Sequence, residues 1–266
     1  MTDTLPLVLE ERHGPTLLLT LNRPERHHAL NRALSEQLDA AVVRAEADPE
    51  VRVIVLTGGG DRAFCAGADM VETSGADGAR TAANAGNGQP ARAAGAGGAI
   101  ARITMTPLPV IAAVNGYCYG GGAALAIACD IRLASDTATF RLPGVEYGLV
   151  VAAASLPRLV GAAKAKELIY TARRFDAAEA FACGLVNAVY EQTALLPAAL
   201  AMAETIAANS VAAVRASKQV IDAATLSDAA RTLEAEVNRT LRGSPEQIAR
   251  FRDATQRVTG RTVPQA

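Results

Sequence analysis

Two glycine-containing segments carry the residues best suited to chemistry. The first is residues 62–70 (RAFCAGADM), and the second is residues 115–122 (NGYCYGGG). Each follows a short apolar run that is typical of a buried strand, and α/β sheets bind ligands at the carboxyl ends of their strands. The glycine triplet precedes an apolar helical pattern, so its backbone N–H groups are free to face an anion. A second N–H, from the turn around Gly67 and Ala68, would complete a two-donor oxyanion hole.

Other interpretations of these glycines can be tested on the sequence. A nucleotide-binding P-loop requires a Lys after its last glycine, whereas Gly122 is followed by Ala123. The dinucleotide fingerprint G-x-G-x-x-G is absent, because three other residues separate Gly116 from Gly120. Glycines that only allow a helix to pack closely on a strand are the alternative that stays open.

The elements that would position these segments alternate between strand and helix. Buried-strand patterns lie at residues 17–21, 51–57, 109–114, 131–134, 139–142 and 184–190. Asn31 can cap a helix that ends at Asp48 and Pro49, and a second short helix is expected at 123–129. Strands buried on both faces and joined through helices indicate a mainly parallel sheet. The sequence therefore predicts an α/β fold.

The second half of the chain has a helical pattern from about residue 155 onward. Helices are expected at 162–171, 176–183, 194–209, 211–222, 227–241 and 245–259. We expect a core over residues 1–200 that carries the site, and a C-terminal helical region over residues 201–266. Residues 73–98 contain no large apolar side chain. They are expected to form a flexible surface segment, either a lid beside the site or an insertion without a role.

Composition and charge exclude several classes of protein. The 266 residues include 26 Lys and Arg against 27 Asp and Glu, so no basic excess favours nucleic acid. No apolar stretch reaches about 18 residues, and the N-terminus does not have the pattern of an export signal, so we expect a cytoplasmic protein that does not bind membranes. The 4 Cys contain no C-x-x-C pair and the 3 His have no metal-ligand spacing. Neither a disulfide scaffold nor a metal site is expected.

Taken together with Asn22-Arg23-Pro24 and Cys129-Asp130-Ile131, the two glycine segments resemble the crotonase superfamily, the enoyl-CoA hydratases and isomerases. The resemblance extends over nearly the whole chain. It implies a spiral of ββα turns with a C-terminal helical trimerisation region, assembled as a homotrimer or homohexamer. It also implies an acyl-CoA ligand whose thioester oxygen lies between the backbone N–H groups of Ala68 and Gly121. No cofactor is implied beyond the coenzyme A of that ligand.

The same resemblance assigns a coenzyme A contact to two segments of the chain. The residues that would border the adenine and pantetheine are Arg26, Ala29, Ala66, Asp69 and Met70. Arg26 suits a phosphate contact, although a solvated arginine in a loop is the alternative. Family members often add a basic or aromatic group from the C-terminal helices to the coenzyme A site. Arg250, Phe251 and Arg252 lie in that region, and the sequence does not distinguish among them.

The chain departs from the family at the two glutamates that hold water in typical hydratases. Those positions are Ala124 and Gly144, and neither can transfer a proton. Glu146 is the nearest acid. If residues 145–147 are extended, residues 144 and 146 point to the same side, about 6–7 Å apart, so Glu146 could face the pocket. A single displaced carboxylate suits isomerisation, which moves one proton, better than hydration.

The residues leave three alternatives open. Glu146 could be a surface carboxylate, which would leave a non-catalytic acyl-CoA-binding protein. Tyr117, Tyr119 and Tyr147 could donate hydrogen bonds, although tyrosines beside a glycine turn are more often packing residues. A thioesterase or hydrolase ranks lower, because no paired acid and base stands in the sequence. The small residues Ala124, Gly144 and 152–154 predict room for a branched or bulky acyl group.

Overall fold

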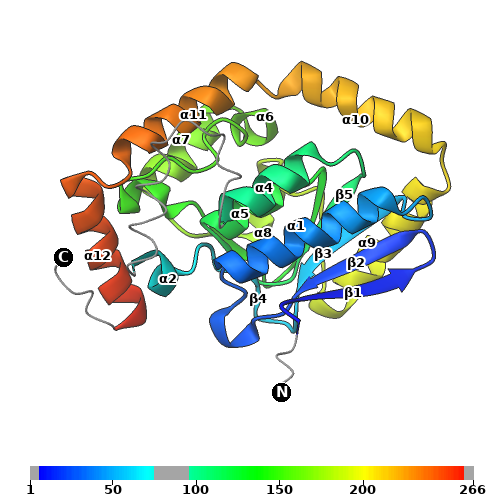
Figure 1. The fold of residues 1–266 in the computed structure, drawn as a ribbon, viewed down its shortest axis with the longest axis horizontal. Helices are drawn as coiled ribbons and strands as arrows, with labels where there is room; N and C mark the ends of the chain where they lie inside the picture. Colours follow the sequence, from blue (N-terminus) through cyan, green and yellow to red (C-terminus); the bar gives the residue numbers. More distant parts are fainter. Residues whose placement is uncertain (1–5, 75–95, 261–266) are drawn as a thin grey trace.

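Two sheets organise residues 6–74 and 96–260, the residues that this computed structural model describes (Figure 1). The larger sheet has the strand order β1 (Val8–His13), β2 (Thr16–Leu21), β3 (Val53–Gly58), β5 (Val110–Val114), β7 (Ile131–Ser135) and β10 (Ala188–Tyr190). All of its neighbouring pairs are parallel except β1 with β2. The predicted α/β class with a mainly parallel sheet is confirmed.

Both faces of the larger sheet are covered, which explains its continuous apolar strands. Every residue of β3 is buried, and alternate residues point to opposite faces. Ile54 and Leu56 belong to the main core with α1 (Arg32–Ala47), α4 (Ala96–Met105) and α5 (Gly121–Ala128). Val53 and Val55 instead contact α9 (Gln192–Ala207) on the other face.

Helix α1 illustrates how local sequence sets an element. The side chain of Asn31 accepts a hydrogen bond from the N–H of Leu34 at 2.9 Å, which satisfies one free donor of the first turn. The helix buries the predicted apolar face and ends at Asp48. It covers the larger sheet beside the site, and its start fixes the chain immediately after the candidate coenzyme A segment.

The smaller sheet was not predicted, although it carries the site. Its strands are β4 (Ala63–Cys65), β6 (Tyr117–Tyr119), β8 (Thr139–Arg141) and β9 (Phe175–Asp176) in that order. Strands β4, β6 and β8 are parallel, so their carboxyl ends meet at one edge. The two glycine turns leave from that edge.

Helices dominate the chain after η2 (Pro143–Tyr147), as predicted. They are α6 (Pro157–Val160), α7 (Ala162–Thr171), α8 (Ala177–Ala182), α9, α10 (Val211–Thr225), α11 (Asp228–Leu241) and α12 (Pro245–Thr259). The expected boundary between residues 200 and 201 lies inside α9, which packs on the larger sheet. Helices α10 and α11 run along the outside of the core, and α12 turns back beside α2 (Met70–Ser74) (Figure 1).

Two local expectations differ from the structure. Residues 145–147 are not extended, because they belong to the 3-10 helix η2 (Pro143–Tyr147), which Pro143 starts. Of the expected flexible segment 73–98, residues 73–74 end α2 and residues 96–98 begin α4, and the remainder lies outside the described residues.

None of the helices in the described part of the chain has, by itself, the length and apolar composition of a membrane span. Within the same residues, α9 and α10 together meet that length and composition, but the two helices are bent by 107° at the break between them.

Candidate active site

The two glycine turns are in direct backbone contact. A Cβ atom added to Gly67 would lie 2.9 Å from the carbonyl oxygen of Tyr119 and 3.3 Å from the nitrogen of Gly121. A Cβ added to Gly121 would lie 3.4 Å from the nitrogen of Ala68. Gly67 also has a φ of 106°, a region that favours glycine. The chain therefore requires glycine where the turn after β4 meets the start of α5.

Two backbone donors stand side by side at this contact. Ala68 forms an isolated parallel bridge with Leu30, in which the bonds run from the N–H of Leu30 to Gly67 and from the N–H of Asp69 to Leu30. The N–H of Ala68 is left out of that pattern, and Gly121 is the first residue of its helix. Within the described residues neither N–H has a hydrogen-bond partner. Two adjacent free donors suit an oxygen that gains negative charge.

The turn after β4 is held by a nearly buried ion pair. Arg23 donates to Asp69 at 3.0 Å and to the carbonyl oxygen of Ala29 at 2.7 Å. The other carboxylate oxygen accepts the N–H groups of Val71 at 3.1 Å and Glu72 at 3.4 Å, which caps α2. Burial alone would raise the pKa of Asp69, but the bonds from Arg23, Glu72 and Val71 outweigh it and lower that pKa.

His28 fixes the chain on the opposite side of the same turn. Its Nδ1 accepts the N–H of Arg23 at 3.0 Å, so its Nε2 carries the proton that is donated to the carbonyl oxygen of Gly59 at 2.9 Å. Burial lowers the pKa of His28, although the bond to Gly59 opposes this. The side chain is a neutral bridge between this turn and the end of β3. The sequence indicates only that His28 lacks metal-ligand spacing, and it gives no signal for this bridging role.

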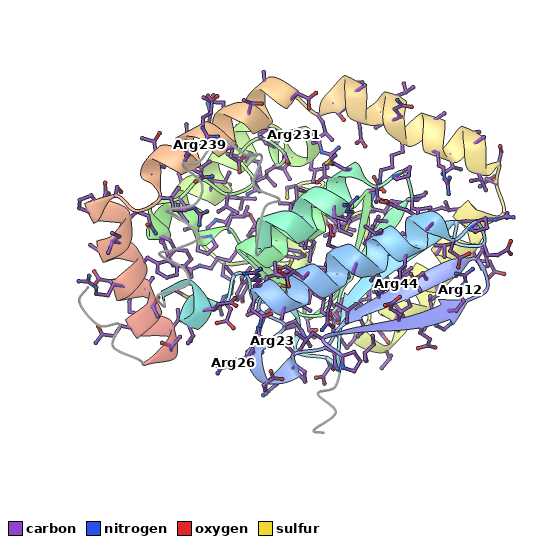
Figure 2. All side chains as sticks on the ribbon, in the orientation of Figure 1. Arg12, Arg23, Arg26, Arg44, Arg231 and Arg239 are labelled. Carbon is purple, nitrogen blue, oxygen red and sulfur yellow. The ribbon has the colours of Figure 1, made fainter. Side chains whose placement is uncertain are left out.

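The segments assigned to coenzyme A lie beside each other. The N–H of Ala66 donates to the carbonyl oxygen of His27 at 2.9 Å, and the bridge at Leu30 continues the contact. Arg26 is exposed at the outer edge of the turn before α1 (Figure 2), and Ala29 and Ala66 are half-buried. Met70 is half-buried at the start of α2.

Neither Ala124 nor Gly144 offers a group that titrates, and the space at Gly144 is filled. A Cβ on Gly144 would lie 2.8 Å from Cγ2 of Val151 and 2.9 Å from the carbonyl oxygen of Leu149. Ala124 is buried within α5. The expected room at Gly144 is therefore not there, because the following loop folds back over it.

Glu146 forms an ion pair with Arg141, which lies on the preceding strand, β8. Its Oε1 accepts a hydrogen bond from Arg141 at 2.6 Å, and its side chain is 31% exposed. Arg141 also donates to the carbonyl oxygen of Ala172 at 2.8 Å. On β8 the buried Phe140 points into the core, so Arg141 points to the opposite face of the smaller sheet.

The tyrosines close to the glycine turns pack together on that sheet. The rings of Tyr117 and Tyr119 stack with centroids 5.5 Å apart, and the hydroxyl of Tyr119 bonds to that of Thr139 at 2.8 Å. Tyr147 lies elsewhere, on η2, and burial raises the pKa of its hydroxyl. Tyr119 therefore has a structural partner for its hydroxyl.

Helix α12 covers η2. A Cβ on Gly148 would lie 3.1 Å from Cα of Gln247, and the ring of Phe251 meets Tyr147 edge-on with centroids 6.2 Å apart. Of the three candidates on this helix, Arg250 pairs with Glu246 at the surface. Phe251 packs inward, and Arg252 is half-buried with an Nε that has no partner in the described part of the chain.

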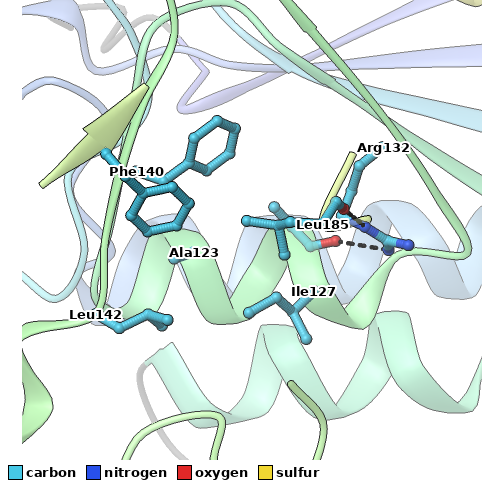
Figure 3. A pocket seen from close by; sticks show the side chains of 8 residues that line it. Ala123, Ile127, Arg132, Phe140, Leu142 and Leu185 are labelled. Carbon is cyan, nitrogen blue, oxygen red and sulfur yellow. Dashed lines mark hydrogen bonds between the residues drawn. The ribbon is translucent and has the colours of Figure 1, made fainter. Parts of the chain in front are cut away.

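A small apolar cavity lies behind α5 and does not include the two backbone donors (Figure 3). Its volume of about 10 Å³ accommodates about one water molecule, so it is too small for a substrate. Arg132 lines it and donates to the carbonyl oxygens of Leu185 at 2.8 Å and Cys129 at 2.6 Å. Burial lowers the pKa of Arg132 to about 10, so it remains cationic at neutral pH.

Among the described residues no group of three or more His, Cys, Asp or Glu side chains could hold a metal ion.

Comparison with known proteins places this chain in a family. A sequence model described as enoyl-CoA hydratase/isomerase matches residues 11–258. A short-chain-enoyl-CoA hydratase from Clostridium acetobutylicum is 38% identical over 218 residues, which cover 81% of this chain and 80% of that protein. A probable enoyl-CoA hydratase from Rhizobium meliloti is 40% identical over 218 residues, with coverages of 81% and 80%.

Solved structures agree with this match. A carnitinyl-CoA dehydratase from Mycobacterium avium 104 superposes with a TM-score of 0.78 at 33% identity, over 91% of this chain and 94% of that one. The family match covers most of the chain and includes both glycine turns. This confirms the crotonase-type α/β fold with its C-terminal helices. The chain belongs to the enoyl-CoA hydratase/isomerase family.

Proposed function

We propose that this protein binds an acyl-CoA thioester and catalyses an isomerisation or a related reaction through an enolate. The observation that carries the proposal is the pair of free N–H groups of Ala68 and Gly121, which belong to contacting turns. The thioester oxygen would accept both donors. Arg26, Ala29, Ala66, Asp69 and Met70 would border the coenzyme A. The reaction requires no cofactor beyond that coenzyme A.

The proton transfer is assigned to Glu146. Its carboxylate would remove a proton from the carbon next to the thioester, and the electron pair of that C–H bond would move onto the carbonyl oxygen. Returning the same proton to a different carbon of the enolate would shift the double bond without gain or loss of atoms. Arg141 holds Oε1 of Glu146, so Oε2 is the atom assigned to the proton.

Hydration through a pair of carboxylates is not proposed for this chain. The positions at which the family resemblance implies those carboxylates hold Ala124 and Gly144. Acid–base catalysis needs a titratable group close to the proton that it moves. The names of the related hydratases therefore support the type of ligand more than the reaction.

Binding without catalysis is the second candidate. It is favoured by the ion pair between Glu146 and Arg141, which occupies one oxygen of the assigned base. In this case the two backbone donors would still hold the thioester, and no proton would move.

A Glu146→Gln variant separates the two candidates, with Glu191→Gln as a control because Glu191 is exposed at the start of α9. Conversion of a 3-enoyl-CoA to its 2-enoyl isomer and the affinity for the thioester are both measured. We expect Glu146→Gln to lower turnover about a hundredfold or more, and Glu191→Gln to leave it unchanged.

The other outcomes are equally informative. Full turnover by Glu146→Gln would remove Glu146 from the mechanism. Tight binding by the parent without turnover of the enoyl-CoA would favour the binding protein. If the parent does not bind acyl-CoA more tightly than free coenzyme A, the assignment of the two donors is wrong.

We also propose that the protein assembles as a homotrimer or homohexamer. Large apolar side chains on α10 and α11 support this, because Val220, Ile221 and Leu233 are 68%, 59% and 60% exposed in the single chain. Light scattering on the purified protein measures the mass directly. A monomer at micromolar concentration would contradict the proposed assembly.

A further inference from the structure

Helix α11 holds the loop of residues 150–154 through two side chains; this segment is called the clamped loop below. The carboxylate of Glu234 accepts the N–H of Ala152 at 3.0 Å with one oxygen and the N–H of Ala154 at 2.7 Å with the other. Asn238 accepts the N–H of Val150 at 2.9 Å and donates to its carbonyl oxygen at 2.6 Å. Glu234 and Asn238 lie four residues apart, on the same face of the helix.

The clamped loop needs this support because of its backbone conformation. Ala152 has a φ of 59°, in the left-handed region that an alanine rarely adopts. It is buried, and its carbonyl oxygen accepts the N–H of Leu156 at 2.9 Å. Converging backbone N–H groups in such a turn form a concave site for an anion, and the carboxylate of Glu234 occupies it. Helix α11 therefore stabilises a turn whose conformation is unfavourable for an alanine at position 152.

One side chain of the clamped loop, that of Val151, points toward Gly144 in η2. Cγ2 and Cβ of Val151 would lie 2.8 Å and 3.1 Å from a Cβ on Gly144. Gly144 follows Pro143, whose Cγ would lie 3.8 Å from a Cβ on Gly120. Gly120 directly precedes Gly121, which supplies one of the two free donors. Val151 thus occupies the space that a side chain at position 144 would take. This space lies close to the start of α5.

We propose that Val151 determines which acyl groups the site accepts, and that Glu234 is the positioning residue that sets its place. This inference rests on the proposed binding of an acyl-CoA thioester. Val151 forms the wall of the acyl pocket that a residue-144 side chain would otherwise form. The preferred ligands are then thioesters with a short, unbranched acyl group. This replaces the sequence-based expectation that a branched or bulky group is tolerated.

The test compares the affinities of Glu234→Gln and Val151→Ala for three probes: free coenzyme A, crotonyl-CoA, and the branched 3-methylcrotonyl-CoA. Glutamine keeps one acceptor oxygen and turns an amide toward the second backbone N–H. Glu236→Gln is the matched control, since Glu236 is exposed on the same helix. All variants are checked for folding by thermal melting.

The parent is expected to prefer crotonyl-CoA over the branched thioester. In Val151→Ala that preference should fall about tenfold, because two methyl groups are removed from the wall. In Glu234→Gln it should fall by a similar factor, about tenfold, for the loss of a hydrogen bond to a charged group. Free coenzyme A should bind all variants equally, and Glu236→Gln should match the parent.

An unchanged preference in Val151→Ala would overturn the role of Val151, and it remains decisive if Glu234→Gln does not fold. An unchanged preference in a folded Glu234→Gln would overturn the role of Glu234. A parent that does not distinguish crotonyl-CoA from free coenzyme A would instead contradict the proposed function itself. The two failures are therefore distinguishable in one set of titrations.

Discussion

Arg23 and Asp69 form an ion pair of 3.0 Å between segments 46 residues apart, with side chains only 12% and 11% exposed. The pair connects the turn before α1 to the turn that carries Ala68. The second oxygen of Asp69 caps α2. One carboxylate therefore holds the turn before α1, the turn after β4 and the start of α2 in place around the N–H of Ala68. Its contribution is positional, because its bonds to Arg23 and to the first turn of α2 hold the segment that would border the coenzyme A.

Replacing Asp69 by Asn is expected to lower both stability and thioester affinity. The neutral amide has one acceptor oxygen, so either Arg23 or the N–H groups of Val71 and Glu72 lose their acceptor. Among the described residues, the remaining acidic neighbour of the nearly buried guanidinium is the exposed Glu25, at 3.9 Å. Removing one partner of a buried ion pair costs about 3–5 kcal/mol of unfolding free energy, and a loss at the lower end is expected for this nearly buried pair. Denaturant titration and crotonyl-CoA binding measure the two effects.

Asp48→Asn is the matched control for that experiment. Asp48 also pairs with an arginine, Arg12, and also accepts a backbone N–H, from Glu50, but both charged side chains are more than a third exposed. An exposed pair of this kind contributes little, so no measurable loss is expected. Equal losses in the two variants would show that burial of the Arg23–Asp69 pair does not matter.

Stability should fall as the pH decreases through about 6.5, and His28 is the group responsible. The folded state lowers the pKa of His28 below its ordinary value of 6.5. Between the two pKa values the unfolded chain binds a proton that the folded chain does not, so stability is complete above pH 6.5 and decreases below it. Denaturation midpoints at pH 7.5, 6.5 and 5.5 measure this slope.

His28→Asn provides the comparison for the pH series. Asparagine can still accept the N–H of Arg23, and it tolerates the φ of 55° at this position. The variant is expected to be less stable at pH 7.5, because the bond to Gly59 is lost, and to have a flatter pH dependence. An identical slope in both proteins would assign the titration to another group.

Gly67→Ala should remove thioester binding. The substitution combines a φ of 106° with a Cβ that would lie 2.9 Å from the carbonyl oxygen of Tyr119, so the two donor turns must separate. Gly14→Ala is the control, because Gly14 has a φ of 56° and no atom within 4 Å of the added Cβ. That control should lose only about 1 kcal/mol of unfolding free energy to backbone strain, with unchanged affinity. Retained binding in a folded Gly67→Ala would contradict the contact between the turns.

Adding glutamates at Ala124 and Gly144 should not create a hydratase. A glutamate at Gly144 would meet Val151 and the carbonyl oxygen of Leu149 at less than 3 Å, so the variant should be destabilised. Adding Val151→Gly to the pair should recover part of the stability, because it removes the closest side chain. Calorimetry and a hydration assay with crotonyl-CoA check both steps. Hydration by the double variant alone would contradict the packing described for Val151.

Local patterns predicted the elements that depend on local sequence. The cap at Asn31, the buried face of α1 and the bounds of α7 and α12 follow from periodicity, capping residues and Gly or Pro stops. Strands β4, β6 and β9 have only two or three residues, too few for a pattern. They are stabilised by their neighbours in the smaller sheet, which the sequence does not display.

The site was predictable in its backbone and less so in its side chains. Both glycine turns were expected at the carboxyl ends of buried strands, and the family resemblance implied that Ala68 and Gly121 would lie together; the two turns are in contact. The pairing of Glu146 with Arg141 and the filling of the space at Gly144 depend on chain reversals in η2 and the clamped loop. No periodic pattern encodes these contacts, because they join residues through tertiary packing.

The packing of Val151 against Gly144 constrains the order in which this sequence can change. A lineage that had lost a carboxylate at position 144 and then closed the loop over it could not regain that carboxylate by a single substitution. The loop would have to open first, through a change at Val151 or at Glu234, 83 residues away from Val151 in the chain. The contact therefore makes recovery of a side chain at position 144 depend on a second change in the loop that covers it.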